Sequence, residues 1–211
     1  MEAPFANRQM AARLLAQQLL HLRRLPGVVL AVPRGALPMG TVIARALDWP
    51  LDVVLTKKLG HPHNPEFAIG AVSEQGYVLS PNVAVPGAWL TERVAAIQAE
   101  LKTRRQAYQG LRPPQPLNGR PVVVVDDGAA TGHTLLATIT LVRQQRPQRI
   151  IVAVPVASPE ALRRLQAAAD EVVCLLAPLD FRAVGQYYQD FSEVTDEEAL
   201  AVFSPAQHPA S

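Results

Sequence analysis

Short, largely apolar runs alternate along the chain with longer segments of mixed polarity. The apolar runs are Val28–Val32, Leu51–Thr56, Val122–Val125, Arg149–Val156 and Val172–Leu176. Runs of this kind suit strands that are covered on both faces, as in parallel sheets. Between and around them, helical patterns occupy residues 7–25, 37–47, 89–108, 132–145 and 159–169. Alternating strands and helices predict an α/β fold with a mainly parallel central sheet flanked by helices.

The pattern loosens in two places, after the second apolar run and after the last. Residues 59–87 are rich in Gly, Pro, His and Asn, and we expect only short strands there, at 67–72 and 77–79. We interpret 59–116 as a flexible lid loop with a helical insertion, and 177–211 as a small hood and tail. Both belong to one domain, residues 1–211, because a chain of 211 residues is ordinary for a single domain.

Composition narrows the class of protein. The chain is 49% hydrophobic and 18% charged, with a net charge of +2, which suits a globular protein and gives no basic footprint for nucleic acid. Its single cysteine, Cys174, cannot form an intrachain disulfide, which fits a reducing compartment. No signal peptide is recognisable, and no run approaches the ~20 apolar residues of a membrane span. We therefore expect a cytoplasmic protein with neither nucleic acid nor membrane as a partner.

The most informative segment follows the valine run at 122–125. Asp126 and Asp127 come first, then the small-residue stretch Gly128, Ala129, Ala130, Thr131 and Gly132, and His133 and Thr134 open the next helix. Ligands of parallel sheets bind at the carboxyl ends of the strands, and a helix N-terminus binds anions. Two carboxylates beside such an anion site suit a sugar phosphate, since they accept hydrogen bonds from hydroxyls and favour positive charge on a sugar ring.

This segment resembles the phosphoribosyl pyrophosphate (PRPP) signature of type I phosphoribosyltransferases. The resemblance implies that fold, with Asp126 and Asp127 on the ribose hydroxyls, directly or through Mg²⁺. It also implies that residues 128–134 bind PRPP, with 130–134 on the 5′-phosphate. The ordinary alternative is a strand that ends in two aspartates before a helix.

Two further segments resemble parts of that family. Pro33, Arg34 and Gly35 follow the first strand, like the loop that grips pyrophosphate, and we expect a cis peptide near Arg34. Lys57 and Lys58 resemble the basic pair before the catalytic loop, where they neutralise leaving pyrophosphate. Without the aspartate segment, residues 33–35 would be interpreted as an ordinary turn, and the two lysines as a solvent-exposed pair of charges. With Lys57–Gly60, Asn64–Val72 and Tyr187–Phe191, the chain resembles a bacterial subgroup of predicted phosphoribosyltransferases.

These motifs do not identify the molecule that would accept the ribose phosphate. Glu66, in the expected lid, is our candidate general base, and Leu176, Asp180 and Phe181 are candidates for binding a nitrogenous base. His61 and His63 lack the neighbours of a metal site. Relatives in the family are often dimers, and we expect a homo-oligomer.

We therefore predict an enzyme that uses PRPP, Mg²⁺ and a nitrogenous base. The alternative is a regulator that senses PRPP without catalysis. A dinucleotide-binding oxidoreductase is discounted, because no G-x-G-x-x-G follows the first strand.

Overall fold

The computed structural model describes residues 3–80, 83–109 and 114–202 of the chain. Its elements, in chain order, are α1 (Arg8–Leu19), the 3₁₀ turn η1 (Leu20–Leu22), β1 (Val28–Ala31), α2 (Leu37–Leu47), β2 (Leu51–Val53), β3 (Thr56–His61), β4 (Asn64–Ser73), β5 (Tyr77–Leu79), α3 (Gly87–Gln109), β6 (Pro121–Val125), α4 (His133–Arg143), β7 (Arg149–Val156), α5 (Pro159–Ala168), β8 (Glu171–Leu176), η2 (Val184–Tyr187) and α6 (Asp196–Ala201).

A five-stranded, wholly parallel sheet forms the body of the molecule. Its strand order is β2-β1-β6-β7-β8, so β1 and β6 lie side by side at the centre although about 90 residues separate them. The predicted α/β class and mainly parallel sheet are confirmed. The carboxyl ends of β1 and β6 therefore deliver the segments at 33–35 and 126–134 to the same edge of the sheet.

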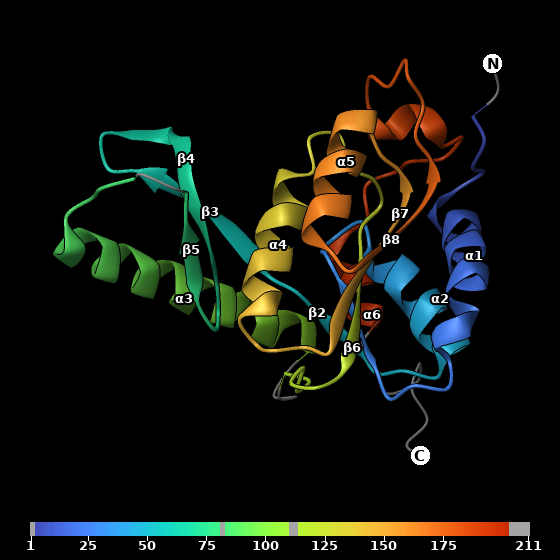
Figure 1. Ribbon diagram of the computed structural model, residues 1–211, viewed down its shortest axis with the longest axis horizontal. Helices are drawn as coiled ribbons and strands as arrows, with labels where there is room; N and C mark the ends of the chain where they lie inside the picture. Colours follow the sequence, from blue (N-terminus) through green and yellow to red (C-terminus); the bar gives the residue numbers. More distant parts are fainter. Residues whose placement is uncertain (1–2, 81–82, 110–113, 203–211) are drawn as a thin grey trace.

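Helices cover both faces of this sheet, which explains why its strands are apolar throughout. Alternate residues of β6 enter two cores: Val123 and Val125 pack with α1 and α2, whereas Val122 and Val124 pack with α4 and α5. In Figure 1, α4 and α5 lie on one side of the sheet and α1 and α2 on the other. All five residues of β6 are buried, so the loop that follows starts from a rigid base.

The region interpreted as a lid forms an arm built of strands and a helix. Strands β3, β4 and β5 form a second, antiparallel sheet that packs on α3 and projects from the body (Figure 1). Leu59, Ile69 and Val72 are buried with Val94 and Ile97 of α3. The expected strands at 67–72 and 77–79 are confirmed within β4 and as β5, but β3 and the full length of β4 were not predicted, because long-range antiparallel pairing organises residues that have little strand pattern of their own.

The second parallel strand is also shorter than predicted. It ends at Val53, and Lys57 and Lys58 lie inside β3 rather than at the end of a parallel strand. The chain leaves the central sheet at Val54 and enters the arm. The run Leu51–Thr56, predicted as one strand, therefore contributes residues to both sheets.

A buried ion network fixes the arm to the body. Arg105 of α3 donates from Nη1 to Oδ1 of Asp52 in β2 at 2.7 Å and from Nη2 to the carbonyl oxygen of Val53 at 2.8 Å, and it pairs with Glu74 at the β4–β5 turn. Only 8% of Arg105 and 2% of Asp52 are exposed. Burial alone would lower the pKa of Arg105, but Asp52 and Glu74 more than offset it, so the guanidinium stays charged.

The C-terminal segment returns to the N-terminus. Backbone hydrogen bonds join Phe5 to Tyr187 and Gln189, and the Phe5 and Tyr188 rings lie 5.4 Å apart. The segment is described as far as Val202, so the rest of the expected tail, 203–211, lies outside the described residues. Within the described parts, no helix is both long and apolar enough to cross a bilayer.

Candidate active site

The small-residue loop after β6 ends in an open helix N-terminus. Gly132 is the N-cap of α4, with φ of +71° and no side chain to cap the helix. Only glycine adopts this left-handed conformation without strain. The His133 N–H lies 3.5 Å from Oγ1 of Thr131, a weak contact, and the first bond along the helix runs from the Leu136 N–H to the Gly132 carbonyl oxygen, so the first turn of α4 can accept an anion. Thr131, His133 and Thr134 are exposed around this end.

The two aspartates stand between this loop and the sheet, partly buried. Oδ1 of Asp126 accepts a hydrogen bond from the backbone N–H of Asp127 at 2.9 Å. Burial, and then the neighbouring charge of Asp127, raises the pKa of Asp126 well above its ordinary value. Burial also raises the pKa of Asp127, and Arg8 opposes that rise. Two carboxylates held this close favour a ligand that brings hydroxyls or positive charge.

The segment after β1 packs directly against this pair. A Cβ at Gly35 would lie 2.2 Å from Oδ2 of Asp127, so only glycine fits. The Pro33–Arg34 peptide bond is cis, as predicted. Arg34 forms an ion pair with Glu193 of the C-terminal segment. The loop that carries Arg34 and Gly35 therefore packs against Asp127.

Arg8 is a member of this site that the sequence did not indicate. Its Nε and Nη2 both lie 2.9 Å from Oδ2 of Asp127, and Nη1 donates to the carbonyl oxygen of Ser192 at 2.6 Å. The guanidinium also lies 3.9 Å from the centre of the Phe191 ring. Arg8 lies 119 positions before Asp127, on an amphipathic helix, so nothing near it in the sequence indicates that the two residues pair.

The two lysines of β3 divide between the faces of the arm. Lys57 lies on the face of buried Leu59, and its Nζ is 2.7 and 2.6 Å from the carboxylate oxygens of Glu100 on α3. Lys58 lies on the opposite face. Both border a groove of about 480 Å³ between the arm and α4, which His133 and Thr134 also line. The arm thus brings Lys58 to the groove that the start of α4 also borders, while the Lys57 ammonium is bound to Glu100 on the α3 face.

Comparison with known proteins decides the family. The phosphoribosyl transferase domain family matches residues 6–191. The chain belongs to this family. Two Mycobacterium tuberculosis proteins named "Putative phosphoribosyl transferase" are 39% identical over 209 residues, which is 96% of this chain and 47% of theirs. The chain thus spans about half the length of these curated relatives.

Solved structures agree on the fold of this phosphoribosyl transferase domain. TT1426 from Thermus thermophilus is 47% identical, with a TM-score of 0.84 over 94% of this chain and 97% of that one. A hypothetical protein from Neisseria gonorrhoeae with bound ppGpp is 13% identical, with a TM-score of 0.51 over 93% of this chain and 90% of that one, a likeness that shows the fold alone.

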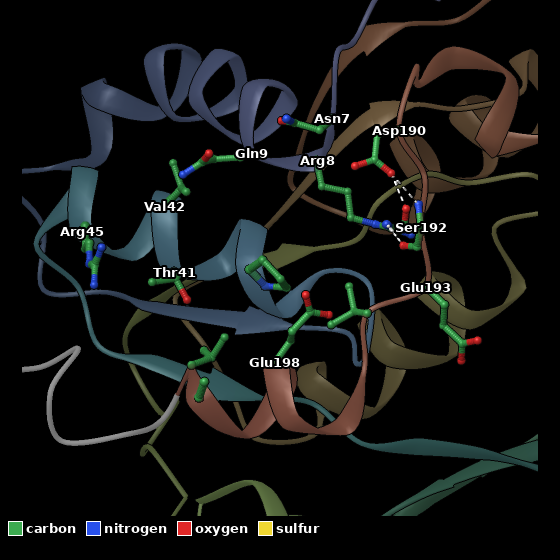
Figure 2. A pocket seen from close by; sticks show the side chains of 14 residues that line it. Asn7, Arg8, Gln9, Thr41, Val42, Arg45, Asp190, Ser192, Glu193 and Glu198 are labelled. Atoms are coloured by element: carbon green, nitrogen blue, oxygen red, sulfur yellow. Dashed lines mark hydrogen bonds between the residues drawn. The ribbon is translucent and has the colours of Figure 1, made fainter.

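Residues predicted to bind the base lie in the C-terminal part of the domain. Leu176 ends β8, Asp180 is exposed, and the Phe181 ring stacks on Tyr187 at 5.6 Å. Burial and the charge of Asp180 raise the pKa of Tyr187. None of the three predicted residues lines a cavity of about 590 Å³ between α1, α2 and residues 190–202. Figure 2 shows that Arg8, Asp190, Ser192 and Glu193 gather at one end of that cavity.

The other residues singled out in the sequence lie in β3, β4, the turn between them and β8. The backbone of Glu66 belongs to β4, but its side chain lies outside the described residues. Rings of His61 and His63 are 5.7 Å apart, and the described part of the chain has no group of three His, Cys, Asp or Glu able to hold a metal ion. Cys174 is partly buried, and its thiol donates to the Leu176 carbonyl oxygen at 3.1 Å.

Proposed function

We propose that the chain binds PRPP with Mg²⁺ and transfers its ribose 5-phosphate to a nitrogenous base, releasing pyrophosphate. The observation that supports this most is the meeting of Arg34–Gly35 with Asp126–Asp127 at one edge of the sheet, beside the open N-terminus of α4. The charge of Arg34 suits the diphosphate, the two carboxylates suit the ribose hydroxyls, and the N-terminus of α4 suits the 5′-phosphate.

Each segment has one role in this proposal. The first-turn N–H groups of α4, with Thr131 and Thr134, hold the 5′-phosphate. Asp126 and Asp127 accept hydrogen bonds from the ribose hydroxyls. As the base nitrogen attacks C1, the C1–O bond to the diphosphate breaks and its electron pair leaves with the diphosphate oxygen. The carboxylates stabilise the positive charge that develops on the ring, and Arg34 and Lys58 stabilise the departing anion.

The donor set at the aspartates fits Mg²⁺ in a substrate complex. Mg²⁺ usually binds one or two carboxylates together with substrate phosphates and waters, rather than a cage of protein ligands. Asp126 and Asp127 supply two carboxylates, and a third acidic or histidine ligand is not grouped with them in the described residues. Bound there, the ion would neutralise diphosphate charge.

The arm and the C-terminal segment complete the proposal. The arm acts as the lid, because it carries Lys58 to the groove above Thr134. Residues 177–202 act as the hood over the acceptor, with Leu176, Asp180 and Phe181 near the base. Glu66 remains our candidate for removing the acceptor's proton.

One assay separates this proposal from a PRPP sensor. Pyrophosphate release from PRPP and Mg²⁺ is measured with a panel of purines, pyrimidines and related amines, alongside PRPP binding. Turnover with any acceptor excludes a pure sensor, whereas binding without turnover across the panel favours one. Asp127→Lys should abolish binding of PRPP, and Glu92→Lys, the same charge change at an exposed position of α3, should not. Binding that survives Asp127→Lys would show that the site is misplaced.

A further inference from the structure

Arg8 occupies a position that helix electrostatics disfavours. It is the first residue of α1, whose N-cap Asn7 accepts from the Met10 N–H at 2.9 Å, and the first turn contains no acidic residue. The N-terminus of a helix carries partial positive charge, so a cation there costs stability. A residue that breaks a local rule in this way usually has a partner elsewhere that compensates.

The compensation comes from three contacts that use all three guanidinium nitrogens. Nε and Nη2 bind Oδ2 of Asp127, Nη1 binds the Ser192 carbonyl, and the planar face covers the Phe191 ring. Only 13% of the Arg8 side chain and 18% of the Asp127 side chain are exposed. Figure 2 shows Arg8 reaching from the start of α1 to Ser192.

These contacts hold one carboxylate oxygen of Asp127, Oδ2, and do not involve the other, Oδ1. Gly35 packs against the same Oδ2, and the Tyr188 hydroxyl donates to the Asp127 backbone carbonyl at 2.7 Å. In the described parts of the structure, Oδ1 of Asp127 has no hydrogen bond to another residue. The carboxylate is therefore held from behind by α1, the loop after β1 and the C-terminal segment, with one oxygen remaining for a ligand.

We propose that Arg8 is a positioning residue for the ribose: it orients Asp127 through Oδ2 and locks the C-terminal segment onto the same carboxylate, which leaves Oδ1 for the sugar hydroxyls. This inference rests on the proposed function. It differs from a general stabilising role, because it predicts that Arg8 affects the ribose part of the ligand and not the diphosphate part, which lies with Arg34.

The test measures binding of three probes in Mg²⁺ buffer by calorimetry: pyrophosphate, ribose 5-phosphate and PRPP. Arg8→Met should raise the dissociation constant for ribose 5-phosphate by about 10-fold or more, the scale of one charge-assisted hydrogen bond, and leave that for pyrophosphate within about 2-fold. Arg13→Met is the matched control, since Arg13 is exposed on the same helix. It should leave the affinities for all three probes unchanged.

A double variant asks whether Arg8 acts through Asp127. If it does, Arg8→Met combined with Asp127→Asn should bind ribose 5-phosphate no more weakly than Asp127→Asn alone. Arg8→Lys keeps the charge, but one ammonium cannot hold both Asp127 and Ser192, so we expect a partial loss confined to the ribose probes. Thermal unfolding of every variant checks that the fold is retained, and if Arg8→Met does not fold, Arg8→Lys decides in its place.

The outcomes separate the two levels of inference. Wild-type protein that binds none of the probes overturns the proposed function, and this inference with it. If wild-type protein binds the probes, three results overturn the inference about Arg8 alone. In the first, Arg8→Met binds all probes like Arg13→Met, and in the second, it loses affinity equally for pyrophosphate and ribose 5-phosphate. The third such result is a loss of affinity that adds fully to the loss caused by Asp127→Asn.

Discussion

Arg105 offers the sharpest test of how the arm is held. Replacing it with Met keeps much of the side-chain volume but removes the cation that neutralises Asp52 and Glu74. Asp52 is 2% exposed, and its Oδ2 also accepts from the Gln115 N–H at 2.7 Å, so water has little access to the abandoned carboxylate. The variant therefore leaves a buried charge without its counter-ion.

The expected loss follows from that burial. Removing one partner of a buried ion pair typically destabilises a protein by about 3–5 kcal/mol, against total stabilities of about 5–15 kcal/mol. For a domain of this size, such a loss lowers the melting temperature by about 6–20 °C. The same loss should loosen β4 and α3 first, because Arg105 is the described residue that ties α3 to both β2 and the β4–β5 turn.

Denaturant unfolding of Arg105→Met, compared with Arg104→Met, measures this effect. Arg104 is the exposed neighbour on the same helix, and its change should stay within about 0.5 kcal/mol. Adding Asp52→Asn to Arg105→Met should recover part of the loss, because the uncompensated charge is then removed. A free energy of unfolding for Arg105→Met within about 1 kcal/mol of wild type would refute the buried-pair reasoning.

Three further predictions concern the site. Gly132→Ala should lower the free energy of unfolding by about 1–2 kcal/mol, from left-handed strain, and weaken ribose 5-phosphate binding. Gly119→Ala, with φ of +70° far from the site, should cost similar stability in the same denaturation assay without affecting binding. Lys58→Ala should lower kcat/KM for PRPP by about 10-fold or more, and Lys57→Ala by much less, because strand alternation turns the Lys57 side chain to the α3 face of the arm, where it binds Glu100. Equal losses in steady-state kinetics would contradict that division. Finally, the raised pKa of Asp126 means that the folded state binds a proton more tightly than the unfolded state. Without ligand, stability should therefore fall as the pH rises above the unfolded-state pKa toward the higher folded-state pKa, and Asp126→Asn should reduce that fall in unfolding measured across pH.

Much of the body could be predicted from the sequence because its elements are specified locally. The limits of α2 and β7 agree with the sequence pattern residue for residue. Strands of a doubly covered parallel sheet are apolar throughout, which makes them recognisable without knowing their neighbours. The glycine-rich segment after β6 was recognisable for the same reason, since strand, acidic pair and helix start are contiguous in the chain.

The arm was predicted only in part, with β5 and the middle of β4 recognised and β3 missed, because its strands are specified by pairing as much as by pattern. Residues 59–73 contain Gly, Pro, His and Asn, and they form β3 and β4 only because each strand meets the other and both meet α3. For the same reason, the lysine pair was placed at a strand end, whereas strand alternation inside β3 sends the two side chains to opposite faces.

The sequence by itself determined the fold class, the order of strands and helices in the body, and the loop that marks the family, because these depend on residues close together in the chain. Only the tertiary structure decided which distant side chains complete the site. Arg8 meets Asp127, and Glu193 meets Arg34, where the chain ends fold back on the sheet edge. Such contacts depend on how whole elements pack, and a single cation or carboxylate on a helix or loop carries no local mark of its eventual partner.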